Sequence, residues 1–206
     1  MYDAFIAAFT ALFVIVDPIG IAPVFAGLTQ GTTVAHKRKM AIRGTIIGTL
    51  ILVFFAAVGK PFLNSLGISM NALRVSGGLM LFIIALEMVF EKRAERKQET
   101  ADKLDEYFED ISVFPVALPL LAGPGAIATI MLLMTSYEHN TAAQLAVMAA
   151  LGVVMLIVLI VFFTAGKLMD LLGPTVNAVL TRLLGVILAA LAAQYVLDGL
   201  KRAFMG

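Results

Sequence analysis

Six stretches of the chain are apolar enough and long enough to cross a lipid bilayer as helices. They cover residues 4–28, 42–62, 71–90, 111–137, 142–166 and 178–200. A helix crosses the hydrocarbon core with about 20 residues, and the stretch 111–137 alone contains 27 residues without a charge. The pattern predicts an all-α, multi-pass membrane protein with six transmembrane helices.

The few charged residues are concentrated in one connector. Residues 91–110 hold 13 charges in 20 positions, which leaves 16 charges for the other 186 residues. Charged residues make up 14% of the chain and the formal net charge is +1, whereas a soluble domain has roughly 25% charged residues. These values exclude a soluble domain, a disordered chain and a nucleic-acid-binding protein. Continuous apolar runs also argue against an outer-membrane barrel, because its strands alternate in polarity.

The positions of Lys and Arg predict the orientation of the chain in a cell membrane, either the inner or the plasma membrane. The connectors after the first, third and fifth stretches hold 11 of the 15 basic residues. Because basic residues accumulate on the cytoplasmic side, both termini are expected outside. The N-terminal apolar run has no basic residue ahead of it, so we expect it to remain as a membrane helix and not to be cleaved as a signal peptide.

The two halves of the sequence resemble each other at an offset of about 106 residues. The matches keep one order along the chain and include Pro18 with Pro124, Leu66-Gly67 with Leu172-Gly173, and Asn71-Ala72 with Asn177-Ala178. Each half contains three of the six stretches, and an odd number places the halves in opposite orientations. We therefore predict one transmembrane domain, 1–206, built from two inverted three-helix repeats, about 1–90 and about 111–206, joined by the cytoplasmic connector 91–110.

Transmembrane helices 1 and 4 are predicted to be discontinuous. They contain the corresponding segments DPIGIAPVF (17–25) and GPGAIATIM (123–131) and five of the seven prolines. Proline interrupts a helix but fits its first turn. We predict that Asp17 and Gly123 are N-cap residues and that Pro18 and Pro124 each begin a second half-helix. The alternative is that these prolines only kink two continuous helices.

Two half-helix N-termini that point into one cavity would offer amide donors to an anionic group such as a carboxylate. Small residues around both breaks leave room for a glycine- or alanine-sized zwitterion. The predicted substrate-binding residues are Asp17, Pro18, Ile19, Gly20, Ile21, Gly123, Pro124, Gly125, Ala126 and Thr129. The hydroxyl of Thr129 has an alternative role in a hydrogen bond between helices.

Asp17 is the charged residue expected deepest in the bilayer, where ionisable groups are costly and usually functional. It is a candidate for binding a substrate ammonium group or for carrying a proton, although it could serve only as a helix cap. Glu87 is a second candidate for proton coupling, with snorkelling near the cytoplasmic end of its helix or pairing with the adjoining loop as the alternatives. Arg74 is expected to anchor its helix at the headgroups. No metal or cofactor site is expected, since the chain has no Cys and its two His residues fall in connectors on opposite sides.

Four segments together resemble the MarC/SnatA family (UPF0056-type) of integral membrane proteins. They are DPIGIAPVF, LPLLAGPGAIAT (118–129), RVSGGLMLFIIALEMVF (74–90) and RLLGVILAALAAQYVLDGL (182–200). The resemblance covers essentially the whole chain, and its signature falls on Asp17, Pro18, Gly20, Pro23, Gly123, Pro124, Gly125 and Ala126. It implies a six-helix inner-membrane transporter of small neutral amino acids such as glycine and alanine, coupled to the proton gradient, with efflux as one direction.

The expected function is therefore secondary transport of small neutral amino acids by alternating access, with the amino acid, protons and the lipid bilayer as partners. An exporter of other small metabolites and an ion channel are the alternatives. A channel usually needs a ring of charged or carbonyl groups, and one deep Asp does not provide it. An enzyme is not expected, because Asp17 has no second deep carboxylate, Cys or His to work with.

Overall fold

The computed structural model describes residues 1–90, 92 and 111–205, and all regular structure in these ranges is helical. The helices are α1 (Tyr2–Val16), α2 (Ala22–Leu28), α3 (Val34–Ser65), α4 (Met70–Val89), η1 (Ser112–Leu121), α6 (Pro124–Ser136) and α7 (Thr141–Phe204). The all-α prediction is confirmed for these residues. The predicted charged connector 91–110 lies, apart from Lys92, outside the described residues.

Four helical segments have the length and apolar character of a membrane span: Val34–Ser65, Met70–Val89, Thr141–Met169 and Thr175–Phe204. Helices η1 and α6 are bent by 56° relative to each other and together would form a fifth span. Helix α1, with 15 residues, is shorter than one bilayer crossing. A first span made of α1 and α2 together, and with it the count of six inverted spans, remains a prediction.

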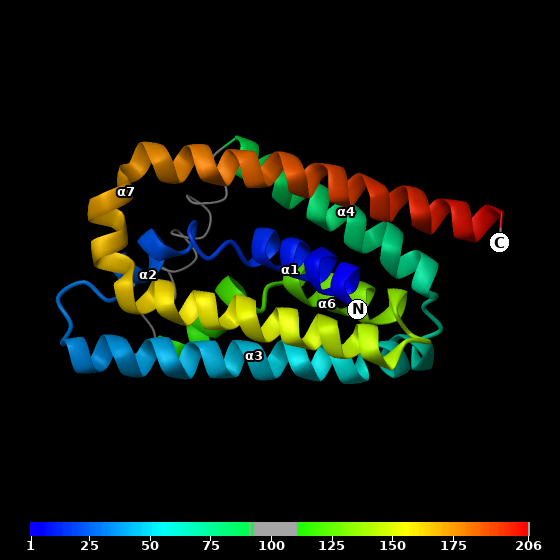
Figure 1. Ribbon diagram of the computed structural model, residues 1–206, viewed down its shortest axis with the longest axis horizontal. Helices are drawn as coiled ribbons and strands as arrows, with labels where there is room; N and C mark the ends of the chain where they lie inside the picture. The colour runs from blue at the N-terminus through cyan, green and yellow to red at the C-terminus, as the bar shows by residue number, and fades with distance from the viewer. Residues whose placement is uncertain (91, 93–110, 206) are drawn as a thin grey trace.

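Helix α7 contains two of these segments in one ribbon, separated by a sharp bend. Gly173 lies at the bend with φ 67° and ψ 169°, a conformation that glycine adopts without a side-chain clash. Figure 1 shows the bend at the end of the bundle where α2 lies, and the second part of α7 returns along the bundle to the C-terminus. The predicted fifth and sixth stretches therefore correspond to the two arms of α7.

Two pairs of parallel segments form the interior of the bundle. Helix α3 packs along η1 and α6 through its glycines: a Cβ added at Gly44 would meet Val116, one at Gly48 would meet Leu121, and one at Gly59 would meet Met131. Helices α1 and α2 run parallel to the first arm of α7 and pack along it. Their contacts include the small-residue cluster Ala4, Ala143 and Ala146 and the stacked rings of Phe25 and Phe162, whose centroids are 4.2 Å apart.

Helix α4 runs antiparallel to the second arm of α7, also at glycine contacts. A Cβ at Gly185 would lie 2.8 Å from Met88 Cβ, one at Gly78 would lie 2.8 Å from the Ala192 carbonyl oxygen, and one at Gly199 would lie 3.0 Å from Arg74 Cβ. Small residues let helix backbones approach closely, as is usual where helices associate in membranes.

The outer surface of the bundle is apolar along whole helices. On α3 the exposed large side chains recur every four residues, which places them on one face: Ile42, Ile46, Leu50, Phe54 and Val58. An apolar stripe of this length would be a liability in water, and it suits contact with lipid chains.

Candidate functional site

The first helix break centres on Asp17, which ends α1. Its backbone adopts the left-handed conformation, with φ 57° and ψ 64°, and its amide donates to the Phe13 carbonyl oxygen at 2.9 Å. Asp and Asn are the side-chain-bearing residues that tolerate this conformation best. The following residue, Pro18, disfavours a right-handed helical conformation at position 17, so the helix stops there. The Asp17 side chain is only 2% exposed.

The Asp17 carboxylate folds back over the turn that follows it. Its Oδ1 accepts a hydrogen bond from the Gly20 amide at 3.1 Å. The Asp17 backbone carbonyl accepts from the Ile21 amide at 3.1 Å. A Cβ at position 20 would overlap the carboxylate, so this turn requires glycine there. The amides of the first break are thus largely bonded within the turn.

The prediction that Asp17 is an N-cap and that Pro18 begins the second half-helix is wrong. Asp17 is the C-cap of α1, and α2 begins only at Ala22, with Ile21 as its N-cap and Pro23 in its first turn. The reason is the left-handed backbone of Asp17, which reverses the chain and leaves residues 18–21 in a turn. The helix is discontinuous as predicted, but the break is longer than one residue.

The second break confirms the predicted cap. Gly123 is the N-cap of α6, with extended backbone at φ −73° and ψ 167°, and Pro124 occupies the first turn. Within the described part of the chain no side chain caps this end. The amides of Gly125 and Ala126 lie in the first turn, where no intrahelical carbonyl precedes them. This end therefore offers free donors next to a backbone position without a side chain.

The segment before the second break is more irregular than a half-helix. In η1, Phe114 and Leu118 have extended backbones, and each precedes a proline in a cis peptide bond. Amides donate five residues back, as from Val116 to the Ile111 carbonyl oxygen at 3.2 Å. A proline disfavours the helical conformation in the residue before it, which explains why Phe114 and Leu118 are extended and why this segment departs from a regular α-helix.

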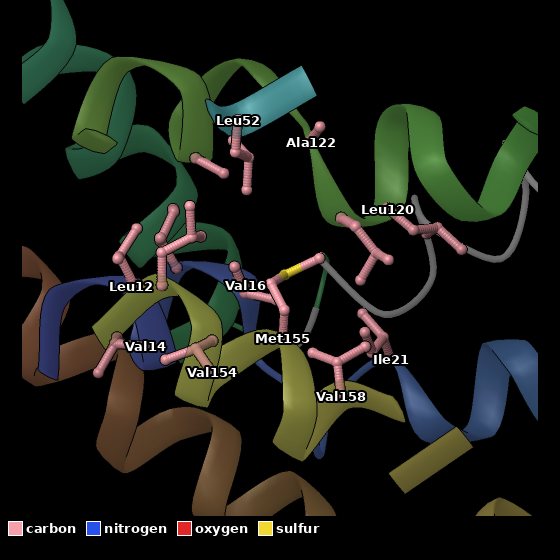
Figure 2. Close-up of a cluster of buried hydrophobic side chains, with 14 of the residues drawn as sticks. Leu12, Val14, Val16, Ile21, Leu52, Leu120, Ala122, Val154, Met155 and Val158 are labelled. Carbon is pink, nitrogen blue, oxygen red and sulfur yellow. The ribbon is translucent and has the colours of Figure 1, made fainter. Parts of the chain in front are cut away.

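The fold brings the two breaks into one buried core. A Cβ added at Gly125 would lie 2.9 Å from Cδ1 of Ile15 on α1 and 2.7 Å from Cδ1 of Ile84 on α4. Val16 and Ile21, which flank the first break, belong to the same apolar cluster as Leu121 and Ala122, which precede the second. Figure 2 shows side chains of this cluster converging from α1, α3, η1 and α7.

Thr129, one turn into α6, is completely buried, and its hydroxyl has no hydrogen-bond partner among the residues that the structure describes. Thr135 and Thr49 donate to the carbonyl four residues back, to Met131 at 2.8 Å and to Thr45 at 2.7 Å, whereas the hydroxyl of buried Thr45 has no partner among the described residues either. Thr129 lies four residues after Gly125 and so shares its helix face. A buried hydroxyl without a partner is costly.

The remaining predicted site residues are distributed around the breaks. Pro18, Gly20, Gly125 and Ala126 are buried, Ile19 and Gly123 are half-buried, and Pro124 is exposed. Glu87 is half-buried on α4, three residues beyond Ile84 and therefore on the side of α4 that faces Gly125. Within residues 1–90 and 111–205, no three His, Asp or Glu side chains gather in a way that could hold a metal ion.

Sequence reasoning missed an ion pair at the end of the bundle where α6 connects to α7. Lys60, near the end of α3, donates to Oε1 of Glu138 in that connection, and their side chains are 36% and 37% exposed. The hydrogen bond from Lys60 lowers the pKa of the Glu138 carboxyl below its ordinary value. The pair joins the first half of the chain to the second and lines a cavity of about 330 Å³.

We expect this pair to give a small, pH-dependent contribution to stability. Because the pKa of Glu138 is lower in the folded than in the unfolded protein, the contribution is complete above the unfolded-state pKa and is lost as the pH falls through the folded-state pKa. A double-mutant cycle of Lys60→Gln and Glu138→Gln, followed by thermal unfolding in detergent, should show coupling at pH 7 and weaker coupling at about pH 3. Equal coupling at both pH values would contradict a carboxylate pair.

Arg74 packs against the second arm of α7, and its expected role as an anchor at the headgroups remains a prediction. It lies in the second turn of α4 and is 7% exposed, and its Nη1 donates to Oδ1 of Asn71 at 3.3 Å. Ser69 caps the start of α4, and its side chain accepts from the Ala72 amide at 3.1 Å. The tight packing of α4 against the second arm of α7 encloses the stem of Arg74.

A bundle of apolar helices with two internal breaks, one beside a buried carboxylate and one with free amides, defines an integral membrane protein of the broken-helix type. The chain belongs to the MarC family of integral membrane proteins, whose family model matches residues 2–204.

Relatives that are similar over nearly their whole length carry the name UPF0056 membrane protein. YvbG of Bacillus subtilis is 34% identical over 206 residues, which cover 99% of this chain and 97% of the relative. YhcE of Escherichia coli is 32% identical over 206 residues, with coverages of 100% and 95%. A relative from Archaeoglobus fulgidus is 34% identical over 198 residues, with coverages of 95% and 92%. No solved structure matches the chain.

Proposed function

We propose that this protein is a secondary transporter that moves small neutral amino acids, with glycine and alanine as the preferred substrates, across the cell membrane by alternating access and in exchange with protons. The observation that carries the proposal is the meeting of two unlike helix breaks in one buried core. The α6 end presents free amides from Gly125 and Ala126, and the other break holds the buried carboxylate of Asp17. These groups have the charges needed for the two ends of an amino-acid zwitterion.

The crowding at the breaks favours a substrate of minimal size. Ile15 and Ile84 already approach the Gly125 backbone within van der Waals distance of an added Cβ, and Gly20 lies directly under the Asp17 carboxylate. A guest that reaches the α6 amides must pass between these side chains, which leaves little room for its own side chain. The hydroxyl of Thr129 supplies a further polar group on the same helix face.

The packing of the helices supports the predicted inverted repeat. If the second half repeats the first, helix 1 corresponds to helix 4 and helix 2 to helix 5. The parallel pair of α3 with η1 and α6 then corresponds to the parallel pair of the first α7 arm with α1 and α2. Matching pairs of this kind are the expected basis for rocking one repeat against the other around a central site.

Proton coupling is assigned to Asp17, with Glu87 as a second proton carrier nearer the cytoplasmic end of α4. In this mechanism the substrate carboxylate binds at the α6 amides, and Asp17 receives either the ammonium group or a proton. The apolar side chains around the breaks exclude water in the closed state, so the charge of Asp17 must be neutralised before the site can change sides.

The test is a panel of amino acids offered to purified protein in liposomes, with and without an imposed pH gradient. Glycine and alanine are expected to show saturable uptake, and with one proton coupled per substrate each pH unit should drive about tenfold accumulation. Phenylalanine and lysine, matched for backbone but not for size or charge, should move much more slowly. The proposal fails if glycine and alanine neither bind nor move, and flux linear in concentration would indicate a channel.

A further inference from the structure

A second cavity lies near the same end of the bundle as the Lys60–Glu138 pair. It has a volume of about 360 Å³, is open to the outside, and is lined by the start of α4, the connection between α6 and α7, and the end of α7. We call it the Arg74 cavity, after the buried arginine in its wall; Ser136, Tyr137, His139 and Arg202 also line it. Volumes of this size are typical of small-molecule sites.

Arg74 is built into the wall of this cavity and is more than nine-tenths buried. Its hydrogen bond to Asn71 Oδ1 fixes one edge of the guanidinium. Among the described residues it is in no ion pair within 4 Å, and a guanidinium has five donors. Burying such a group between helices is costly unless an anion or further acceptors complete its bonding.

The charges around the cavity leave it positive. Arg202 and Asp198 on the last turns of α7 act electrostatically on Arg74, and Asp198 accepts a hydrogen bond from Gln194 at 2.8 Å. Glu138 is already bonded to Lys60. The cavity lining therefore holds two guanidinium groups and one carboxylate, that of Glu138, with His139 as an additional donor, and a guest anion would balance the remaining positive charge.

We propose that the Arg74 cavity binds the carboxylate of a small solute, held between the guanidinium groups of Arg74 and Arg202. Planar guanidinium groups bind carboxylates with paired, charge-assisted hydrogen bonds. The anionic headgroup of a lipid is the other source of this chemistry. The cavity is a waiting site for the amino acid on its way to or from the helix breaks, and that role rests on the proposed transport function.

The absence of native cysteine allows a local test in the whole protein. Ser136 lines the cavity and is exposed, so Ser136→Cys can be modified by a negatively charged methanethiosulfonate reagent. Acetate, which has a carboxylate but no ammonium group, is expected to slow this modification by roughly tenfold when present at about ten times its dissociation constant. Methylammonium should give no protection. Ser65→Cys is the matched control, because Ser65 is exposed at the end of α3 and does not line the cavity.

Arg202→Gln, on the exposed end of α7, is expected to weaken acetate protection by about tenfold or more, the cost of one charged hydrogen-bond partner. Lys201→Gln, its neighbour outside the cavity, should leave protection unchanged. Arg74→Lys keeps the charge but loses the planar fork, so it should weaken protection as well. Because Arg202 is exposed, its variant remains informative even if Arg74→Lys folds poorly.

The outcomes separate this site from the central one. Protection that disappears with Arg202→Gln and persists with Gly125→Leu supports the Arg74 cavity even if no transport is found. Three results would overturn the Arg74 cavity as a binding site and leave the transport proposal standing. They are no protection by acetate, equal protection at Ser136→Cys and Ser65→Cys, and protection that survives Arg202→Gln. Protection by soluble short-chain phosphatidylglycerol in place of acetate overturns it in favour of a lipid headgroup.

Discussion

Gly125→Leu is expected to abolish glycine and alanine transport while the protein still folds. The added Cβ alone would lie 2.7 Å from Ile84 Cδ1 and 2.9 Å from Ile15 Cδ1, and leucine brings three further carbons into the same space. These are the far ends of flexible side chains, so the helices can adjust at a cost of about 1–3 kcal/mol. The α6 amides would then be covered and displaced, and a shift of this size lowers the rate on the order of 100-fold. Initial uptake rates in liposomes and thermal unfolding in detergent measure the two effects.

Gly152→Leu is the matched control for this substitution. A Cβ at Gly152 meets nothing within 4 Å, and the residue is exposed on the first arm of α7, so the same change should leave uptake and unfolding near wild type. If Gly125→Leu does not fold, Gly125→Ala adds only the Cβ and should lower uptake with a smaller loss of stability. Wild-type uptake by Gly125→Leu would remove the α6 end from the substrate path.

Hydropathy predicted the four apolar segments that are long enough to span a membrane, and the bent pair η1 and α6, but not where the helices end. The stretch 42–62 corresponds to α3, which in fact begins at Val34 and runs through the basic residues 37–39. The gap predicted between the fifth and sixth stretches is largely helical, and the chain turns only near Gly173. Apolar composition reports contact with lipid, whereas helix ends depend on caps and on backbone conformations at single residues.

The first break shows why the site was predicted only in part. Asp before Pro is compatible with the start of a helix and equally with its end, since Asp can cap a helix start and can also adopt the left-handed conformation that closes one. The φ of 57° at Asp17 shows that this residue ends a helix, and the sequence pattern alone does not predict that backbone conformation. At the second break, Gly123 followed by Pro124 has fewer options, and the prediction was confirmed.

Contacts between residues that are far apart in the sequence could not be predicted from sequence patterns. Lys60 and Glu138 are separated by 78 residues, and Arg74 meets Arg202 only because α4 and the second arm of α7 pack at glycine contacts. Helical periodicity places a residue on a face of its own helix but does not give the height at which two helices meet. The ion pair and the Arg74 cavity therefore emerge only from the packed structure.

The structure sharpens the difference between the two breaks. Sequence reasoning assigned free amides to both, whereas the first break uses its own carboxylate and carbonyl to bind the amides of Gly20 and Ile21. The Gly125 and Ala126 amides at the α6 end have no side-chain cap and no preceding intrahelical carbonyl. The carboxylate of the guest is therefore expected at α6, and Asp17 is left with two roles, a structural one in the turn and a chemical one toward a positive charge or a proton.

Asp17→Asn separates these two roles. Asn has the same shape, keeps an Oδ1 acceptor for the Gly20 amide and tolerates the left-handed backbone, so the turn should persist and stability should change by no more than about 0.5–1 kcal/mol. The substitution removes the charge and the proton-binding carboxylate. We expect accumulation driven by a pH gradient to fall at least roughly tenfold, since one coupled proton accounts for about a factor of ten per pH unit. Substrate exchange at equal pH on both sides would then show whether binding of the ammonium group is lost as well.

Asp17→Ala supplies the structural counterpart. Alanine cannot accept the Gly20 hydrogen bond and strains at positive φ, so this variant should lose about 1–3 kcal/mol of stability that Asp17→Asn retains. A transport defect shared by both variants, with a stability defect only in Asp17→Ala, assigns the carboxylate a role in transport beyond its role as a cap. Normal gradient-driven transport by Asp17→Asn would instead leave Asp17 as a cap alone. Proton coupling would then have to reside elsewhere, and Glu87, on the side of α4 that faces Gly125, becomes the residue to substitute next.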